Sequence, residues 1–170
     1  MLCIHNPGSE KGSFISGAKE TPAKKMNSWV WLCYDQLNLE LLRDVSTQPS
    51  NTGLILIESS AKGKAHPYHK QKLAFLLSNM RHFAVEAVNQ GFEVQYIITK
   101  GSYHEALRHL HSTVGQIQAI EHAERSTRLE VQPLVDEGLL LVHPHRGWLT
   151  TEALSLIHIS EPTRPRLSSY

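Results

Sequence analysis

Five short apolar segments alternate with segments of helical character along the middle of this chain, and this alternation constrains the fold most. Strands separated by helices pair in parallel through right-handed crossovers. The sequence therefore predicts an α/β fold, doubly wound and Rossmann-like or flavodoxin-like, with a five-stranded, mostly parallel sheet and helices on both faces. The expected strands are 29–34, 54–57, 93–99, 116–120 and 139–142, and the expected helices are 37–43, 67–84 with its continuation to Gly91, 102–114 and 126–136.

The composition is that of a soluble globular protein. The 170 residues suit one domain, with 41% hydrophobic and 19% charged residues. A net charge of +1 gives no general case for nucleic-acid or membrane binding. No apolar run approaches the roughly 20 residues of a membrane-spanning helix. Cys3 and Cys33 are too few for a disulfide framework, and Cys33 reads as a buried, reduced thiol, so we expect a cytoplasmic protein.

Both ends of the chain differ from the middle. Residues 1–25 are rich in Gly, Ser, Lys and Pro and show no periodicity, so they are predicted to be a disordered or non-native extension before Met26. The other end begins LSLIHISEPTR at 154–164, which resembles the translation of a transposase adapter used in sequencing libraries. We therefore predict a non-native tail over 154–170 and place the domain at 26–153. A continuous natural reading frame through codon 154 in genomic DNA would refute the adapter interpretation.

Acidic residues end three of the expected strands. Asp35 follows the first strand, Glu58 the second and Glu121 the fourth. In a doubly wound sheet ligands bind outside the carboxyl ends of the strands, near the point where the strand order reverses. The three carboxylates suit the hydroxyls or ring nitrogens of a heterocyclic ligand, or a metal ion. Each of them alone is equally suited to capping the next helix.

Other motifs point to no catalytic chemistry. Neither a dinucleotide-binding G-x-G-x-x-G nor a phosphate-binding loop is present, and no Ser or Cys nucleophile stands in a recognisable elbow. The pairs His66-x-x-His69 and His143-x-His145 lack the further ligands of a usual zinc site, so no metal site is predicted. The loop 61–72 carries four lysines and no acid; it is either a solvated loop or a contact for phosphate.

The long helix at 67–84 has an unusual outer face. Its apolar stripe runs from Leu73 to Val88 at helical spacing and predicts packing on the sheet. Phe75 and His82 lie seven residues apart on the opposite face, where a surface helix is normally polar. Either Phe75 is a single exposed aromatic residue or this face is covered by a second layer or domain.

From about residue 29 to 151 the chain resembles the N-terminal domain of the photolyase-related proteins, the bacterial cryptochrome and (6-4) photolyase group that carries an iron-sulfur cluster. Four blocks carry the resemblance in order, of which the helix block is the most specific. They are Asp35-Gln36-Leu37, then Glu58, then His69-Lys70-x-Lys72 with Ser78-x-Met80-Arg81-His82-Phe83-Ala84, and finally Glu121 with Glu124-Arg125.

The resemblance implies light-driven DNA repair or blue-light signalling. In the family, FAD in a helical C-terminal domain donates an electron to a pyrimidine photoproduct, and four cysteines of that domain hold the cluster. With two cysteines this chain has neither the cluster nor a complete FAD site. It is therefore interpreted as a truncated antenna domain that is inactive alone and reaches DNA only through the full-length protein. Phe75, Arg81 and His82 would face the missing FAD domain.

The family's N-terminal domain often holds an antenna chromophore, a ribityl-lumazine in characterised relatives. The resemblance implies that the residues binding this chromophore are Asp35, Gln36 and Glu58, with Glu121 nearby. The sequence departs from the family at Tyr34, where a glycine is usual. It also has Lys62 and Ala65 where lumazine binders have an acid and a tyrosine. A lumazine, a different antenna and no antenna all remain open.

Two other functions fit the predicted fold. The chain is alternatively a free-standing α/β ligand-binding module without catalytic activity, which requires a natural stop codon near residue 153. A response-regulator-like phosphoacceptor would use Asp35 in an acidic pocket. This last function is disfavoured, because the third strand ends in Thr99-Lys100 where an aspartate nucleophile is expected.

Overall fold

A single parallel sheet organises the protein. The computed structural model describes residues 2–5, 28–45 and 51–145. The strands follow the order β1-β4-β3-β2-β5-β6, and every neighbouring pair is parallel. The doubly wound α/β fold is thus confirmed, with one strand more than the five predicted. The strands are β1 (Leu2–His5), β2 (Ser28–Leu32), β3 (Thr52–Ser59), β4 (Glu93–Thr99), β5 (Ile117–Ile120) and β6 (Leu140–His143).

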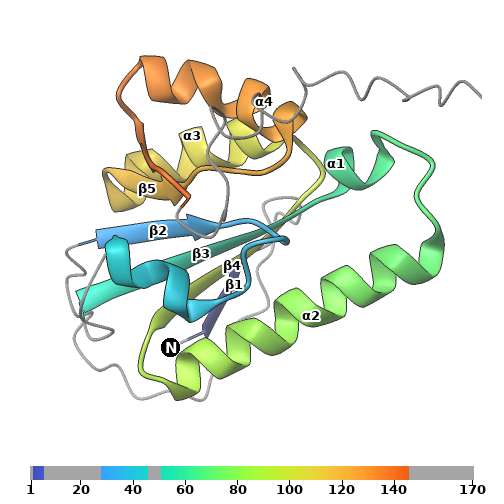
Figure 1. The fold of residues 1–170 in the computed structure, drawn as a ribbon, viewed down its shortest axis with the longest axis horizontal. Coiled ribbons are helices and arrows are strands. Elements are labelled where there is room, and N and C mark those ends of the chain that lie inside the picture. Colours follow the sequence, from blue (N-terminus) through green and yellow to red (C-terminus); the bar gives the residue numbers. More distant parts are fainter. Residues whose placement is uncertain (1, 6–27, 46–50, 146–170) are drawn as a thin grey trace, which may run out of the picture.

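Helices cover both faces of the sheet (Figure 1). The long helix α2 (Lys70–Asn89) and the 3-10 helix η1 (Leu39–Asp44) lie on one face, and α3 (Tyr103–Val114) and α4 (Arg125–Asp136) lie on the other. Successive strand residues alternate between two cores, with Trp31 and Ile55 towards α3 and α4 and Leu32 and Leu56 towards α2. None of the described helices is long and apolar enough to span a bilayer.

The additional strand β1 lies within the segment 1–25 for which we predicted no structure. It pairs with β4 at the edge of the sheet, from Leu2 opposite Val94 to His5 opposite Ile97. Four residues are too few to give a periodic signal, and this pairing depends on the edge that β4 offers from a distant part of the chain. The other residues of the predicted extension, and all of the tail 154–170, lie outside the described residues.

The strand order reverses between β2 and β5. From β2 the chain builds β3 and β4 towards one edge, and it then crosses back to place β5 and β6 on the other side of β2. Loops leaving neighbouring strands in opposite directions open a crevice beyond the carboxyl ends of the strands, which is where doubly wound proteins bind ligands. The residues that follow β2 and β5 therefore meet at this switch point.

Helix α2 is longer than the sheet that it covers. Its C-terminal half packs on the sheet through the buried Met80, Phe83, Ala84 and Ala87. Its N-terminal half extends past the carboxyl end of the sheet (Figure 1), and Leu73, Leu76 and Leu77 there are only partly buried. The predicted helix is confirmed, although it begins at Lys70 with His69 as its N-cap. A short helix, α1 (Ser60–Lys64), occupies part of the predicted basic loop.

Candidate ligand-binding site

A pocket with a volume of about 130 Å³, open to solvent, lies beyond the carboxyl ends of β2 and β3. The projecting half of α2 supplies one wall and α1 another, and these walls meet residues that follow β2 and begin α3. The lining combines an apolar set, Ile57, Leu73, Leu76, Leu77 and Met80, with three tyrosines, Tyr34, Tyr68 and Tyr103, and a polar set, Glu58, Ser59, Lys62, Gly63 and Lys72.

Glu58 is the one predicted cofactor-binding residue that lines this pocket. It lies within β3, which runs two residues further than predicted, so its side chain is held in the sheet and is only 8% exposed. Arg81 donates two hydrogen bonds to the carboxylate, from Nε to Oε1 at 2.8 Å and from Nη2 to Oε2 at 3.0 Å. The Tyr96 hydroxyl donates a third to Oε1. The charge of Glu58 is therefore compensated within the domain.

A second ion pair closes the other side of the pocket. The Lys62 ammonium lies 2.7 Å from Oε1 of Glu124, a residue that precedes α4. The Tyr34 hydroxyl donates to Oε2 of the same carboxylate at 2.8 Å, and Ser126 and Thr127 donate to it at 2.6 and 3.1 Å. Burial and this bond to Glu124 raise the pKa of Tyr34, so the phenol stays protonated at neutral pH.

The Glu124 network predicts a specific loss of stability in acid. Burial alone would raise the pKa of Glu124, but the bonds from Lys62, Ser126 and Tyr34 outweigh it and lower this pKa from 4.5 to about 2. A carboxyl whose pKa is lower in the folded state stabilises the protein above its unfolded pKa, and this stabilisation is lost as the pH falls. It is therefore complete above pH 4.5 and declines towards pH 2.

We expect the substitution Glu124→Gln to lower the free energy of unfolding by about 1–2 kcal/mol at pH 7, with partial solvent exposure limiting the effect. Urea denaturation of both proteins between pH 7 and pH 2 measures this difference. The gap between wild type and variant should close towards pH 2 as the wild-type carboxyl becomes protonated. A gap that stays constant over this range would contradict the assignment.

Gln36 has a structural position at the switch point rather than a place in the pocket. Its side chain is buried, and its Oε1 accepts a hydrogen bond from the backbone nitrogen of Cys33 at 3.3 Å. Its Nε2 donates to the carbonyl oxygens of Ile120 and Glu121 at 3.1 and 3.0 Å. The amide thus joins the end of β2 to the end of β5.

Asp35 and Glu121 also lie at the carboxyl end of the sheet but outside the pocket lining. Asp35 is exposed, and burial of part of the carboxyl raises its pKa. The Glu121 carboxylate is partly exposed and lies 3.4 Å from Arg128, and the Glu121 carbonyl oxygen accepts a hydrogen bond from Gln36. The four predicted residues therefore share one edge of the sheet without meeting around one ligand.

The pocket contains residues to which the sequence analysis gave other roles. Leu73, Leu76 and Leu77 belong to the helical stripe that was expected to pack on the sheet. The sequence does not show where the sheet ends, so it could not distinguish leucines that line a pocket from leucines that pack on the sheet. Lys62 was considered as part of the basic loop and as a departure from the family, and no pattern linked it to Glu124, 62 positions along the chain. Tyr34 lies two residues beyond the end of β2, whereas the sequence had placed it at the end of the expected strand 29–34 and noted it as a departure from the family.

Three of the four histidines in the two predicted pairs have structural contacts in the described part of the chain. The ring of His66 lies edge-on to Tyr68, with 5.6 Å between ring centroids, and His69 caps α2. Nε2 of His143 forms a hydrogen bond with Oε1 of Gln118 at 2.7 Å. Each of these three residues thus has a structural contact of its own.

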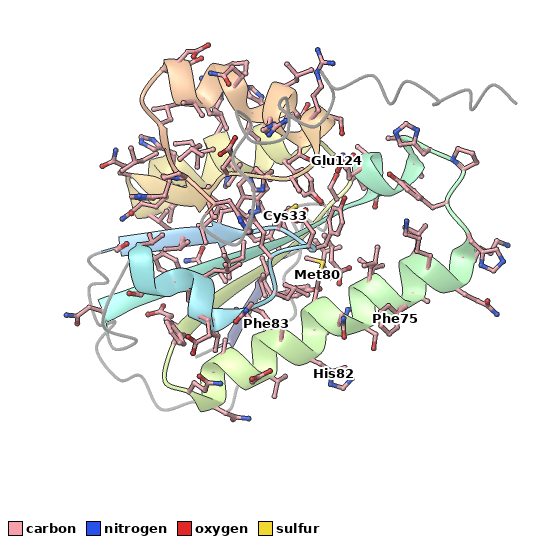
Figure 2. All side chains as sticks on the ribbon, in the orientation of Figure 1. Cys33, Phe75, Met80, His82, Phe83 and Glu124 are labelled. Atoms are coloured by element: carbon pink, nitrogen blue, oxygen red, sulfur yellow. The ribbon has the colours of Figure 1, made fainter. Side chains whose placement is uncertain are left out.

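The outer face of α2 carries the aromatic residue singled out in the sequence. Figure 2 shows Phe75 and His82 on the side of the helix opposite to Met80 and Phe83. Phe75 is 66% exposed and His82 is exposed. Arg81, predicted with them as an interdomain residue, holds Glu58 while its side chain remains 60% exposed.

Comparison with known proteins gives two matches. The sequence model of one family, described as "Deoxyribodipyrimidine photo-lyase-related protein", matches residues 30–169. A (6-4) photolyase of Agrobacterium fabrum (strain C58 / ATCC 33970) is 32% identical over 71 residues, which are 42% of this chain and 14% of that protein. This chain thus matches a small part of the length of its relative. The family match includes residues 154–169, and their foreign origin stays a prediction.

Proposed function

Because this chain belongs to the deoxyribodipyrimidine photo-lyase-related protein family, we propose that it is the N-terminal antenna domain of a light-dependent flavoprotein of that family. In this proposal the domain binds a flat chromophore and passes its excitation energy to FAD in a helical C-terminal domain. DNA repair or light signalling then belongs to the full-length protein. The observation that carries the proposal is the pocket between α1, α2 and the ends of β2 and β3.

The walls of the pocket support a flat aromatic ligand. Leucines of α2 and the aromatic rings of Tyr34 and Tyr103 offer apolar surface to the faces of a ring. An antenna makes and breaks no bonds, so its site needs orientation and exclusion of water rather than a nucleophile or a base. The apolar walls of the pocket suit both requirements.

The charges of the pocket favour a neutral ring with a polar tail. Glu58 is compensated by Arg81, and Lys62 by Glu124, so neither pair demands a charged ligand. Lys72 lies at the pocket with its ammonium 5.3 Å from the centroid of the Tyr68 ring. Hydroxyl groups of a polyol tail would find donors and acceptors in Ser59, Tyr68 and Lys72. A ribityl-lumazine has this combination of ring and tail.

A ligand titration with a blocked pocket tests the proposal. Ribityl-lumazine fluorescence is followed as the full chain is added, and saturable binding is expected. Leu76→Trp should weaken binding at least tenfold, because an indole at that position fills the pocket. Leu129→Trp, at an exposed position on α4, is the matched control and should leave the affinity unchanged. Absence of binding to the wild type, or equal affinity of the two variants, would refute this antenna.

We also propose that the outer face of α2 contacts the helical FAD domain in the full-length protein. The support is that Phe75 and His82 are both exposed on the outer face of α2, where neither side chain contributes to the core of this domain. In a full-length relative, hydroxyl-radical labelling of the residue equivalent to Phe75 should be severalfold weaker than in its isolated N-terminal domain. The residue equivalent to Leu129 should label equally in both. Equal labelling at both positions would contradict the contact.

A further inference from the structure

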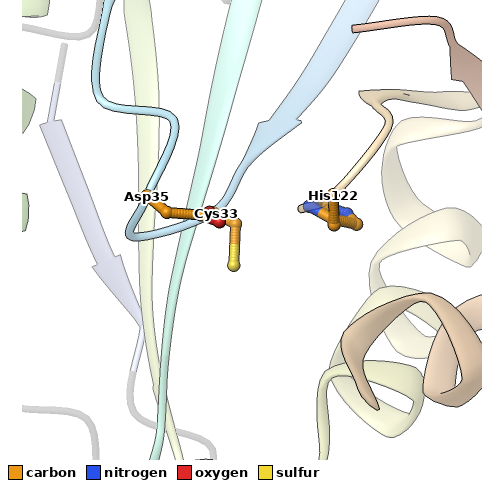
Figure 3. A group of neighbouring side chains, drawn as sticks. All are labelled: Cys33, Asp35 and His122. Atoms are coloured by element: carbon orange, nitrogen blue, oxygen red, sulfur yellow. The ribbon is translucent and has the colours of Figure 1, made fainter. Parts of the chain in front are cut away.

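Three potential metal ligands converge at the switch point, beside the pocket. Cys33 and Asp35 follow β2, and His122 follows β5. One ligand atom from each of the three lies within 4.8 Å of the other two. Figure 3 shows the Cys33 side chain between the carboxylate of Asp35 and the ring of His122. Since ligands of doubly wound sheets bind at this point, the position is one at which a bound ion is expected.

His122 gives an independent reason to expect a ligand. The residue is 2% exposed, and both of its ring nitrogens are buried without a hydrogen-bond partner. Its ring packs against Trp31, with 4.4 Å between the centroids, so the orientation of the imidazole is fixed. Burial lowers the pKa of His122 to about 4, which leaves the ring neutral with a free lone pair. Buried polar atoms normally have partners, so these nitrogens need an explanation.

We propose that Cys33, His122 and Asp35 bind a zinc ion, with water as the fourth ligand. A thiolate, an imidazole and a carboxylate are the three side chains that zinc prefers, and three protein ligands with one open position are a common arrangement. The thiolate and the carboxylate together neutralise the dication. Two cations lie near His122, and each has an acidic partner that offsets its charge: Lys62 pairs with Glu124 at 2.7 Å, and Arg128 with Glu121 at 3.4 Å.

The surroundings allow the ion to enter and the ligands to close on it. Asp35 is exposed and forms the solvent side of the site, while Cys33 and His122 form its buried side. Ligand atoms around tetrahedral zinc are about 3.3–3.8 Å apart, so ligand atoms that lie within 4.8 Å of one another need only small side-chain rotations to reach that geometry. Burial raises the pKa of the Cys33 thiol, and metal binding displaces its proton to solvent.

Cobalt(II), a spectroscopic substitute for zinc, tests the site in the full chain kept reduced with a phosphine. We expect a near-ultraviolet thiolate-to-cobalt charge-transfer band that saturates at about one ion per chain and disappears when zinc is added. Cys33→Ser should abolish the band. Asp35→Asn, at an exposed position where the fold is not at risk, should weaken cobalt binding at least tenfold, as should His122→Gln.

Cys3→Ser provides the matched control, because Cys3 is the other cysteine of the chain. This substitution should leave the band unchanged. Far-ultraviolet circular dichroism of each variant establishes that it is folded. The proposal is overturned if the wild type gives no charge-transfer band, if the band depends on Cys3, or if Asp35→Asn binds cobalt as tightly as the wild type.

Discussion

Replacing Gln36 with alanine should lower the free energy of unfolding by about 2–4 kcal/mol. The substitution removes three hydrogen bonds of a buried amide. It leaves the carbonyl oxygens at the end of β5 without that donor, and an unsatisfied buried group costs more than the bond itself. Urea denaturation followed by circular dichroism measures the change.

The matched control for this prediction is Gln90→Ala. The Gln90 amide bonds Glu86 on the exposed surface of α2, at 3.2 Å, and its loss should change stability by less than about 0.5 kcal/mol. Lumazine affinity should be unchanged in folded Gln36→Ala, because Gln36 does not line the pocket. A variant of normal stability with impaired ligand binding would show that Gln36 is a ligand-binding residue, as the sequence had suggested.

Replacing Arg81 with alanine should destabilise the protein by about 2–3 kcal/mol at neutral pH. The Glu58 carboxylate, 8% exposed, would keep Tyr96 as a donor but lose both bonds from the guanidinium. Removing one partner leaves a buried charge uncompensated, which is costlier than removing the pair. The 60% exposure of the Arg81 side chain keeps the expected loss below that of a fully buried pair.

A double substitution separates this explanation from a simple loss of contact area. Glu58→Gln together with Arg81→Ala should be more stable than Arg81→Ala alone, because the amide carries no charge to compensate. Arg108→Ala is the surface control: its pair with Glu137 is short, at 2.6 Å, but both side chains are nearly half exposed, so the loss of stability should be much smaller than that of Arg81→Ala. Equal losses for Arg81→Ala and Arg108→Ala would contradict the account.

The fold was predictable because it rests on local periodicity. Apolar runs such as Trp29–Leu32 mark strands that are buried on both faces, and Ser102 with Glu105 forms the capping box expected at the start of α3. Strand β1 escaped prediction because its only support is pairing with a strand some 90 residues away. Helix α1 escaped because Ser60–Lys64 contains a glycine and two lysines and buries no side chain.

The site was predictable only in its general location. Polar residues at the carboxyl ends of β2, β3 and β5 do gather at one edge, as the parallel sheet requires, but the tertiary structure decides which partner each side chain bonds. Glu58 meets Arg81 and Tyr96, and Gln36 meets the end of β5. His122 could not be recognised as a candidate ligand from the sequence, because a single histidine after a strand forms no motif. It stands out only in the structure, where both of its ring nitrogens are buried without a hydrogen-bond partner.

The central claim is that the chromophore lies in the pocket walled by α2 rather than among the acidic residues at the switch point. Backbone and methyl NMR chemical shifts, recorded as ribityl-lumazine is added to the full chain, test it most directly. We expect the largest changes at Leu73, Leu76, Leu77 and Met80, with Glu121 and Arg128 unaffected. Changes centred on Asp35 and Glu121 with none in α2, or no changes at a saturating lumazine concentration, would contradict the claim.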